Sequence, residues 1–199
     1  MTHKVLVLYY SKSGFTRQLA NFIARGINQV AGVEAVMRTV PMVSAVNEQV
    51  APSIPEAGSM YVSADDLNNC AGLALGSPIN FGNMNASLKY FLDSTVPSWL
   101  TGSLVGKPAC VFASGGSLHG GQESCLLSMM IPLLHHGMLI MGLPYTNNEL
   151  NTTSSGGTPY GVTHYCGVNN QNITEEEKKL AIAQGERLAN LVVKLNIKG

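Results

Sequence analysis

The sequence predicts an α/β protein with a doubly wound, five-stranded parallel sheet and helices on both faces. Short apolar runs alternate along the chain with stretches in which apolar residues recur at helical spacing. The runs are apolar without alternation, as in strands that are covered on both faces. Three of them end in loops rich in Gly and Ser. In such sheets these loops gather at one edge, where ligands bind.

Composition limits the classes of partner. The 199 residues are enough for one well-filled domain, and we expect residues 1–199 to form a single one. Twelve basic and twelve acidic residues leave no net charge, which argues against a nucleic-acid partner. Only 12% of the residues are charged, about half the usual share, so we expect a homo-oligomer that buries part of the surface.

Signals that the sequence lacks lead to two expectations, one about localisation and one about metal binding. We find no signal peptide and no stretch long enough to span a membrane, and we therefore expect a cytoplasmic protein without a membrane partner. No set of His, Cys or carboxylate residues has the spacing of metal ligands, so no metal is expected.

The first strand and its loop organise the chain. An apolar run over residues 5–10 is followed by the loop 11–16, SKSGFT, and by a helix over about 16–30. This order places several backbone N–H groups and the positive end of a helix dipole together, which favours an anion. An ordinary turn with a Ser or Thr cap is the alternative. The loop lacks both the Walker A and the GxGxxG pattern and has one cation, Lys12, which favours a monophosphate without a metal.

The later elements follow the same alternation. Residues 41–63 contain three prolines and no clear period, and long loops of this kind are usually functional, contact-forming or disordered. Residues 144–172 form an almost uncharged segment, and a capping box at 174–177 opens the last helix. The remaining strands are predicted over 34–40 (near an edge), 71–76, 107–113 and 138–142, with loops at 77–83 and 114–121 and a helix over 122–136.

Residues 5–16 resemble the phosphate loop of flavodoxins, whose pattern is Ser/Thr-x-Ser/Thr-Gly-x-Thr. The stretches GSPINFGNM, SLHGGQE, LLHHGM and GGTPYG are similar, in this order, to the WrbA family of flavodoxin-like NAD(P)H:quinone oxidoreductases. The resemblance covers essentially the whole chain. It implies a flavodoxin-like fold, FMN as the cofactor, NAD(P)H and a quinone as substrates, two-electron ping-pong hydride transfer, and a homotetramer.

The resemblance also implies roles for individual residues. Residues 11–16 would hold the phosphate, 79–82 the isoalloxazine edge, and 114–119 the opposite wall. His136, the candidate catalytic residue, would lie near the flavin. Trp99, from a neighbouring subunit, and Ser13 would contact substrate. The candidate cofactor-binding residues are Ser11, Lys12, Ser13, Gly14, Phe15, Thr16, Ile79, Asn80, Phe81, Gly82, Ser114, Gly115, Gly116, Ser117, Leu118, His119 and His136.

Several alternatives stay open at this stage. The chain has Ile79-Asn80 where the family usually has Thr-Arg, which removes a cation beside the flavin. Trp99 could be a packing residue, His136 could only interact with a helix dipole, and His119 could be a solvated surface residue. His164 is expected to be structural or exposed. A one-electron carrier and a non-catalytic FMN-binding scaffold remain the rival functions.

Overall fold

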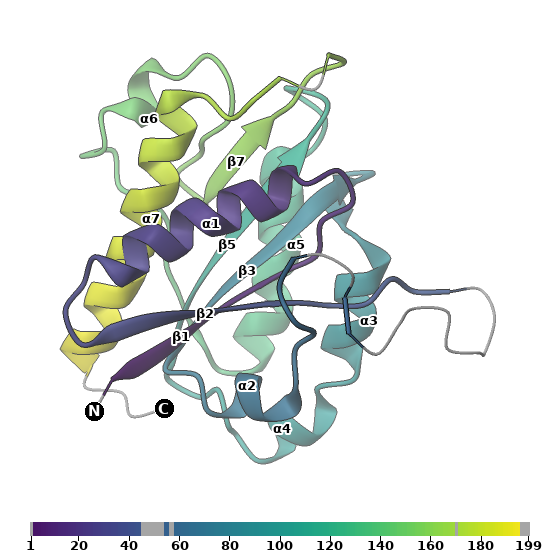
Figure 1. The fold of residues 1–199 in the computed structure, drawn as a ribbon, viewed down its shortest axis with the longest axis vertical. Helices are drawn as coiled ribbons and strands as arrows, with labels where there is room; N and C mark the ends of the chain where they lie inside the picture. The colour runs from purple at the N-terminus through teal and green to yellow at the C-terminus, as the bar shows by residue number, and fades with distance from the viewer. Residues whose placement is uncertain (1, 45–53, 56–57, 170, 196–199) are drawn as a thin grey trace.

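The structure, a computed structural model, describes residues 2–44, 54–55, 58–169 and 171–195. Its centre is a parallel sheet with the strand order β2-β1-β3-β5-β6 (Figure 1). This order confirms the predicted flavodoxin-like, doubly wound sheet, and β2 lies at an edge as expected. The strands are β1 (His3–Tyr9), β2 (Val33–Thr39), β3 (Gly72–Asn80), β5 (Pro108–Gly115) and β6 (Leu139–Ile140).

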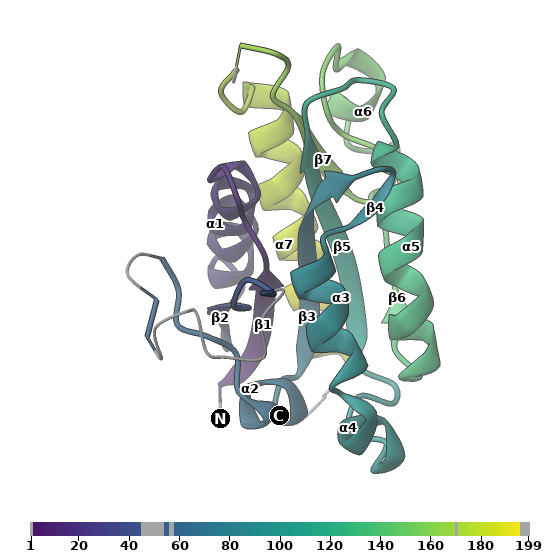
Figure 2. The same ribbon diagram turned by 90° about the vertical axis from the view of Figure 1, so that its right-hand side faces the viewer.

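Helices cover both faces of the sheet, and Figure 2 shows the resulting layers edge-on. Side chains of β1 alternate between the two faces: Val5 and Val7 join one buried cluster, and Leu6 and Leu8 join the other. Both clusters are apolar, which explains why the strand sequence shows no alternation. One face is covered by α1 (Phe15–Asn28) and α7 (Glu175–Leu195), the other by α3 (Ala86–Asp93) and α5 (Gln122–His135).

The fifth strand differs from the prediction, because it consists of two pieces. Of the predicted strand 138–142, only β6 pairs with β5, at the start of β5. The end of β5 pairs with β7 (Val162–Tyr165), which lies in the segment that we expected to be irregular. The segment between β6 and β7, with the short α6 (Glu149–Thr152), is therefore an insertion inside the fifth strand.

The loop predicted at 77–83 is also different. β3 continues to Asn80 and turns back through two residues to pair with the antiparallel β4 (Asn83–Met84). Phe81 and Gly82 have φ values of 50° and 73°, the left-handed conformations that a two-residue hairpin turn requires. Residues 79–82 are therefore the tip of a hairpin, called the hairpin tip below.

Two short helices complete the described structure. α2 (Ala64–Asn68) begins with a capping box and confirms the predicted helical turn near Asp66, and α4 (Val96–Leu100) carries Trp99. Most of residues 45–57, in the long segment 41–63, lies outside the described residues. Within the described ranges, no helix is both long enough and apolar enough to cross a membrane.

Candidate functional site

Three segments meet at the carboxyl edge of the sheet: the phosphate loop (residues 11–16), the hairpin tip, and the third loop (residues 114–121). Thr16 Oγ1 and Ser114 Oγ form a buried hydrogen bond of 2.7 Å between the phosphate loop and the third loop. Ser124 Oγ, in the first turn of α5, donates to the Gly82 carbonyl at 2.9 Å. The structure thus brings together the three segments that the sequence singled out.

The phosphate loop has backbone N–H groups without partners. Gly14, with φ 91°, caps α1, and Ser11 Oγ accepts from the N–H groups of Gly14 and Arg17 at 3.1 and 3.3 Å. Five further N–H groups donate to no atom of the described residues: those of Ser11, Lys12, Ser13, Phe15 and Thr16. An anion in this loop would satisfy them, so the loop fits a phosphate.

A hollow of about 260 Å³ lies beside this loop, lined in part by Lys12, Arg17 and Ser59. Neither cation forms an ion pair with a described residue. The first turn of α1 contains Arg17 and no acidic residue, although the helix dipole favours acidic residues there. Sequence reasoning missed Arg17. A cation in the first turn of a helix was the signal that could have found it.

The hairpin tip presents an aromatic side chain on a constrained backbone. Phe81 is fully exposed, with 110% relative accessibility, although its backbone is held in the left-handed turn. Asn80 Oδ1 accepts from Asn85 Nδ2 at 3.0 Å, so the residue in place of the family arginine is tied to the start of α3. An exposed, oriented aromatic ring is suited to contact a planar ligand.

The third loop is shaped by α5 and by the hairpin tip. Gln122 Nε2 donates to the carbonyls of Ser117 and Leu118 at 3.4 and 3.2 Å. A Cβ on Gly115 would lie 2.8 Å from Ile79 Cδ1, so the hairpin tip and the third loop are in close contact. Gly116, Leu118 and His119 lie at the surface. Gln122 and Ser124 are supporting residues that the sequence did not single out.

The helix α4, which carries Trp99, and the C-terminal end of α5, which is capped by His136, lie at the other, amino edge of the sheet (Figure 2). Leu139 pairs with Pro108 at the start of β5, whereas Ser114 and Gly115 end that strand. Eight residues of strand span about 25 Å, so within one chain neither side chain joins the three segments. The structure does bring the two residues near each other, because Trp99 Nε1 donates to the His135 carbonyl at 3.0 Å.

His136 has a defined tautomer and one unused nitrogen. Thr95 Oγ1 donates to the Leu92 carbonyl at 2.7 Å, so it accepts from His136 Nε2, 2.9 Å away. In a neutral ring with its proton on Nε2, Nδ1 is an acceptor, and this atom is buried without a partner among the described residues. Burial, and then the neighbouring His135, lower the pKa of His136 and favour this neutral ring.

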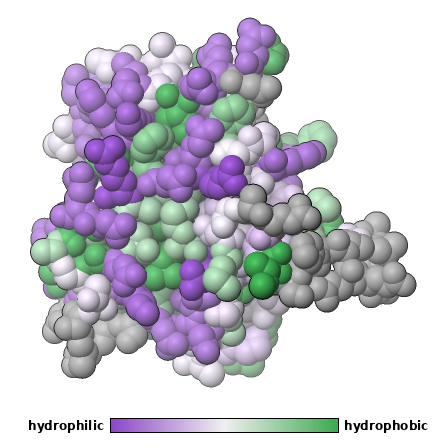
Figure 3. Space-filling view, in the orientation of Figure 1, coloured by the Kyte–Doolittle hydropathy of each residue, from purple (hydrophilic) through white to green (hydrophobic). Residues whose placement is uncertain are grey.

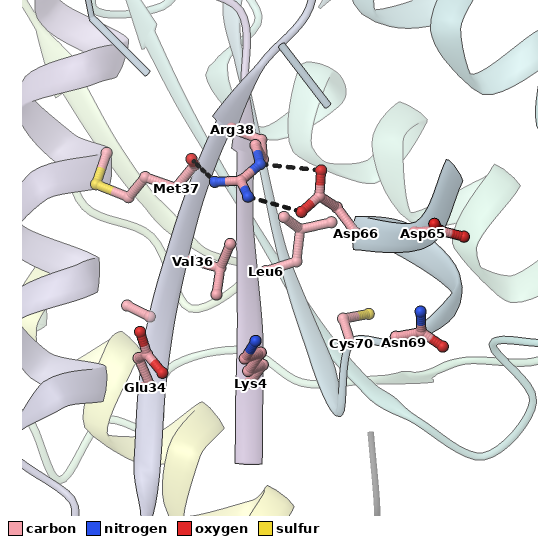
Figure 4. A pocket seen from close by; sticks show the side chains of 11 residues that line it. Lys4, Leu6, Glu34, Val36, Met37, Arg38, Asp65, Asp66, Asn69 and Cys70 are labelled. Atoms are coloured by element: carbon pink, nitrogen blue, oxygen red, sulfur yellow. Dashed lines mark hydrogen bonds and ion pairs between the residues drawn. The ribbon is translucent and has the colours of Figure 1, made fainter. Parts of the chain in front are cut away.

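A separate hollow of about 450 Å³ lies over β1, β2 and α2 (Figure 4). Arg38 holds Asp66 there with two contacts of 2.8 and 2.9 Å, and it also donates to the Met37 carbonyl. Burial tends to raise the pKa of Asp66, but hydrogen bonds from Arg38 and Ser63 bring it below its usual value. These charges are satisfied within the wall, and we assign no ligand to the hollow. No three potential metal ligands cluster among the described residues.

Comparison with known proteins places the chain in a family. Residues 3–149 match the model of the family described as NADPH-dependent FMN reductase. A protein of Geotalea daltonii named NAD(P)H dehydrogenase (quinone) is 39% identical, over 96% of this chain and 98% of its own length. A protein of Geobacter sulfurreducens with the same name is 37% identical over the same shares.

Solved structures agree on the fold. A WrbA-like flavodoxin from Agrobacterium tumefaciens has a TM-score of 0.68 at 18% identity and covers 97% of this chain and 99% of its own. Flavodoxin 1 from Bacillus cereus has a TM-score of 0.62 at 18% identity, over 94% of this chain and 97% of its own. The chain has a flavodoxin-like fold and belongs to the NADPH-dependent FMN reductase family, as its resemblance to WrbA-like proteins predicted.

Proposed function

We propose that the protein is an FMN-dependent NAD(P)H:quinone oxidoreductase. The names of the relatives support the reaction. The cofactor assignment rests on five N–H groups in the phosphate loop that have no partner among the described residues, because a phosphate without a metal would accept hydrogen bonds from such a set. Bound FMN would supply hydride chemistry between NAD(P)H and a quinone, while the protein binds and orients the reactants.

Different segments would bind different parts of the cofactor and the substrates. Residues 11–16 would hold the phosphate, with Lys12 and Arg17 contributing positive charge beside it. Residues 79–82 would run along the edge of the isoalloxazine ring, and residues 114–119 would form the opposite wall. Phe81 would exclude water from one side of the slot for the planar substrates, because its ring is fully exposed at the tip. Ser13, which lines the hollow beside the loop, would contact substrate as well as cofactor.

We propose that the active protein is a homotetramer in which Trp99 and His136 reach the flavin of a neighbouring subunit. Within one chain both lie at the amino edge, and His136 Nδ1 has no partner among the described residues. It would accept a hydrogen bond from a donor of the neighbour's site or from the substrate. Because this nitrogen is buried within the single chain, the side chains that cover it would move when the subunits assemble.

The surface at the amino edge supports the same arrangement. Exposed apolar side chains follow one stripe of α5 at helical spacing and continue over α4 and the loop after it: Leu127, Ile131, Leu134, Trp99, Leu100 and Val105. The opposite face, covered by α1 and α7, differs: there hydrophilic residues break up the apolar patches (Figure 3). An apolar stripe of this kind is typical of a surface that is buried in an oligomer.

Steady-state oxidation of NADH and NADPH with benzoquinone, with and without added FMN, tests the proposal. We expect oxidation that depends on FMN, with one quinol formed for each NAD(P)H consumed. A one-electron carrier would not oxidise NAD(P)H without a partner reductase. Protein that stays colourless after FMN addition and shows no quinone-dependent oxidation would support the non-catalytic scaffold instead.

A further inference from the structure

A buried ion pair lies beside the phosphate loop, outside the site described above. His164 on β7 and Glu177 in the first turn of α7 are both fully buried, and His164 Nδ1 lies 2.8 Å from Glu177 Oε2. The other ring nitrogen, Nε2, lies 3.1 Å from the Gln171 carbonyl oxygen. A carboxylate and a carbonyl can only accept hydrogen bonds. Both ring nitrogens therefore face acceptors, an arrangement that favours a proton on each of them.

Glu177 is held as a carboxylate by several donors. The Oε1 atom accepts from Ser155 Oγ and the Gly156 N–H, both at 2.8 Å, and from the Tyr165 N–H at 3.1 Å. The Oε2 atom also accepts from the Thr174 N–H at 2.9 Å, which completes the predicted capping box. Burial would raise the pKa of Glu177, but the hydrogen bonds from His164, Thr174 and Ser155 lower it to about 2.

The insertion inside the fifth strand thus supplies part of this support. A Cβ on Gly156 would lie 2.6 Å from Glu177 Oε1 and 2.1 Å from the Thr163 carbonyl oxygen, so only glycine fits there. Ser155 and Gly156 belong to the SSGGTPYG stretch, whose role the cofactor site leaves unexplained. In the structure, Ser155 and Gly156 of this stretch donate hydrogen bonds to Glu177, and Glu177 in turn contacts the ring of His164.

His164 also touches the phosphate loop. Its ring centroid lies 4.9 Å from that of Phe15, with the two planes at 44°. Phe15 is the first residue of α1, and its N–H is one of the five that have no partner among the described residues. The backbone of His164 is in register with Ser114 on β5, a link that a change of side chain would leave in place. The ring contact with Phe15 is thus the direct side-chain link from the buried pair to the phosphate loop.

We propose that His164 is a positioning residue for the phosphate end of the cofactor. Glu177 and the Gln171 carbonyl hold its ring as an imidazolium, and the ring fixes Phe15, so that the N–H groups of Phe15 and Thr16 point at the phosphate. The inference rests on the proposed FMN cofactor. It adds a role for the insertion: the segment supports the phosphate loop from within the core.

A comparison of FMN with riboflavin, which lacks the phosphate, tests the role. In the variant His164→Gln we expect the Kd for FMN to rise about tenfold and the Kd for riboflavin to change less than about twofold. The variant His3→Gln, the same exchange at the amino end of β1, should leave both constants unchanged. Equal losses for the two flavins in His164→Gln, or no loss for FMN, would overturn the proposal.

Two further measurements keep the test decisive if His164→Gln does not fold. The ¹⁵N NMR signals of His164 in the wild-type protein at pH 7 should show a proton on both ring nitrogens, and a neutral ring would contradict the proposal. The variant Phe15→Leu should lower the preference for FMN over riboflavin in the same way. Where His164→Gln and the double variant His164→Gln/Phe15→Leu both fold, the loss of FMN affinity in the double variant should be smaller than the product of the two single losses, and full additivity of the free energies would contradict the proposed contact.

The outcomes also separate this inference from the proposed function. Wild-type protein that binds neither flavin would overturn the proposed function. Wild-type protein that prefers FMN, with a preference that neither His164→Gln nor Phe15→Leu changes, would overturn the positioning role alone.

Discussion

The two edges of the sheet are built in opposite ways. At the carboxyl edge, glycine-rich segments are joined by side-chain hydrogen bonds and present N–H groups that have no partner among the described residues. At the amino edge, α4 and α5 present exposed apolar side chains, and the buried imidazole of His136 has a ring nitrogen without a partner in the part of the chain that the structure describes. Among the described residues, the carboxyl edge thus has hydrogen-bond donors without acceptors, and the amino edge has an acceptor without a donor.

This difference between the two edges supports the proposal that two copies of the chain share one site. The carboxyl edge is suited to an anionic cofactor, and the amino edge is suited to contact another protein surface and to accept one hydrogen bond. The length of the sheet keeps the two edges apart within a chain, so they can cooperate only between subunits. Changes at the carboxyl edge should therefore affect stability or cofactor binding, and changes at the amino edge should affect assembly and turnover.

The largest expected effect is on stability at the carboxyl edge. Replacement of Glu177 by Ala leaves the His164 imidazolium and three N–H groups without their acceptor, and it should lower the free energy of unfolding by about 3–5 kcal/mol. Urea denaturation measures the loss. Glu123→Ala, in the exposed first turn of α5, is the matched control and should cost at most about 1 kcal/mol.

The same carboxyl group gives the stability a predictable acid dependence. Because folding lowers the pKa of Glu177 from 4.5 to about 2, its contribution is complete above pH 4.5 and is lost as the pH falls towards 2. The variant Glu177→Gln should lack this part of the acid dependence. Urea denaturation at several pH values compares the two, and identical profiles would contradict the ionised state of Glu177.

The next effect concerns assembly at the amino edge. Ile131→Glu places a charge in the exposed apolar stripe of α5, and we expect smaller oligomers and about a 100-fold loss of quinone reduction. The Kd for FMN should stay within about twofold, because the cofactor segments lie at the other edge. Size-exclusion chromatography with light scattering measures the mass. Val193→Glu on α7 is the control, and an unchanged mass for Ile131→Glu would contradict the interface.

A smaller effect is expected from the tautomer of His136. Thr95→Val removes the oxygen that accepts from His136 Nε2, so the ring can rotate or exchange tautomers. We expect kcat to fall about tenfold while FMN affinity is retained. Thr101→Val, near the end of α4, is the matched control. Loss of FMN affinity with unchanged kcat would assign Thr95 to cofactor binding instead.

The smallest effect concerns the link between two cofactor segments. Thr16→Val removes the 2.7 Å bond to Ser114, a change of about 1 kcal/mol that should weaken FMN binding about fivefold. Fluorescence titration with FMN measures it. The oligomer should be unaffected, and a change of assembled mass would break the proposed division between the two edges.

Much of this arrangement could be predicted from the sequence. The doubly wound parallel sheet, its edge strand and the three segments follow from apolar runs and loop composition, and the flavodoxin-like strand order follows from the family resemblance. The ends of strands were less predictable: Ile79 and Asn80 read as a loop, yet they continue β3 because Phe81 and Gly82 make a tight turn. β7 was missed because four residues between Gly- and Thr-rich stretches carry too little pattern.

The side-chain pairings could not be predicted. The capping box around Glu177 was visible, but its contact with His164 depends on how α7 meets β7 in space. His164 was expected to be structural or exposed, and it is fully buried. The separation of His136 from the phosphate loop, by contrast, could have been predicted, because a helix that joins two parallel strands runs back from the carboxyl edge to the amino edge.

Complementation between two inactive variants tests the shared site most directly. Gly14→Val should lose FMN binding, because valine is strained at φ 91°, and the double variant Trp99→Ala/His136→Ala should bind FMN but reduce quinone poorly. The account predicts that mixed oligomers, purified through two different tags after co-expression, reduce benzoquinone well above the sum of the two parents. Mixed oligomers no more active than that sum would contradict it.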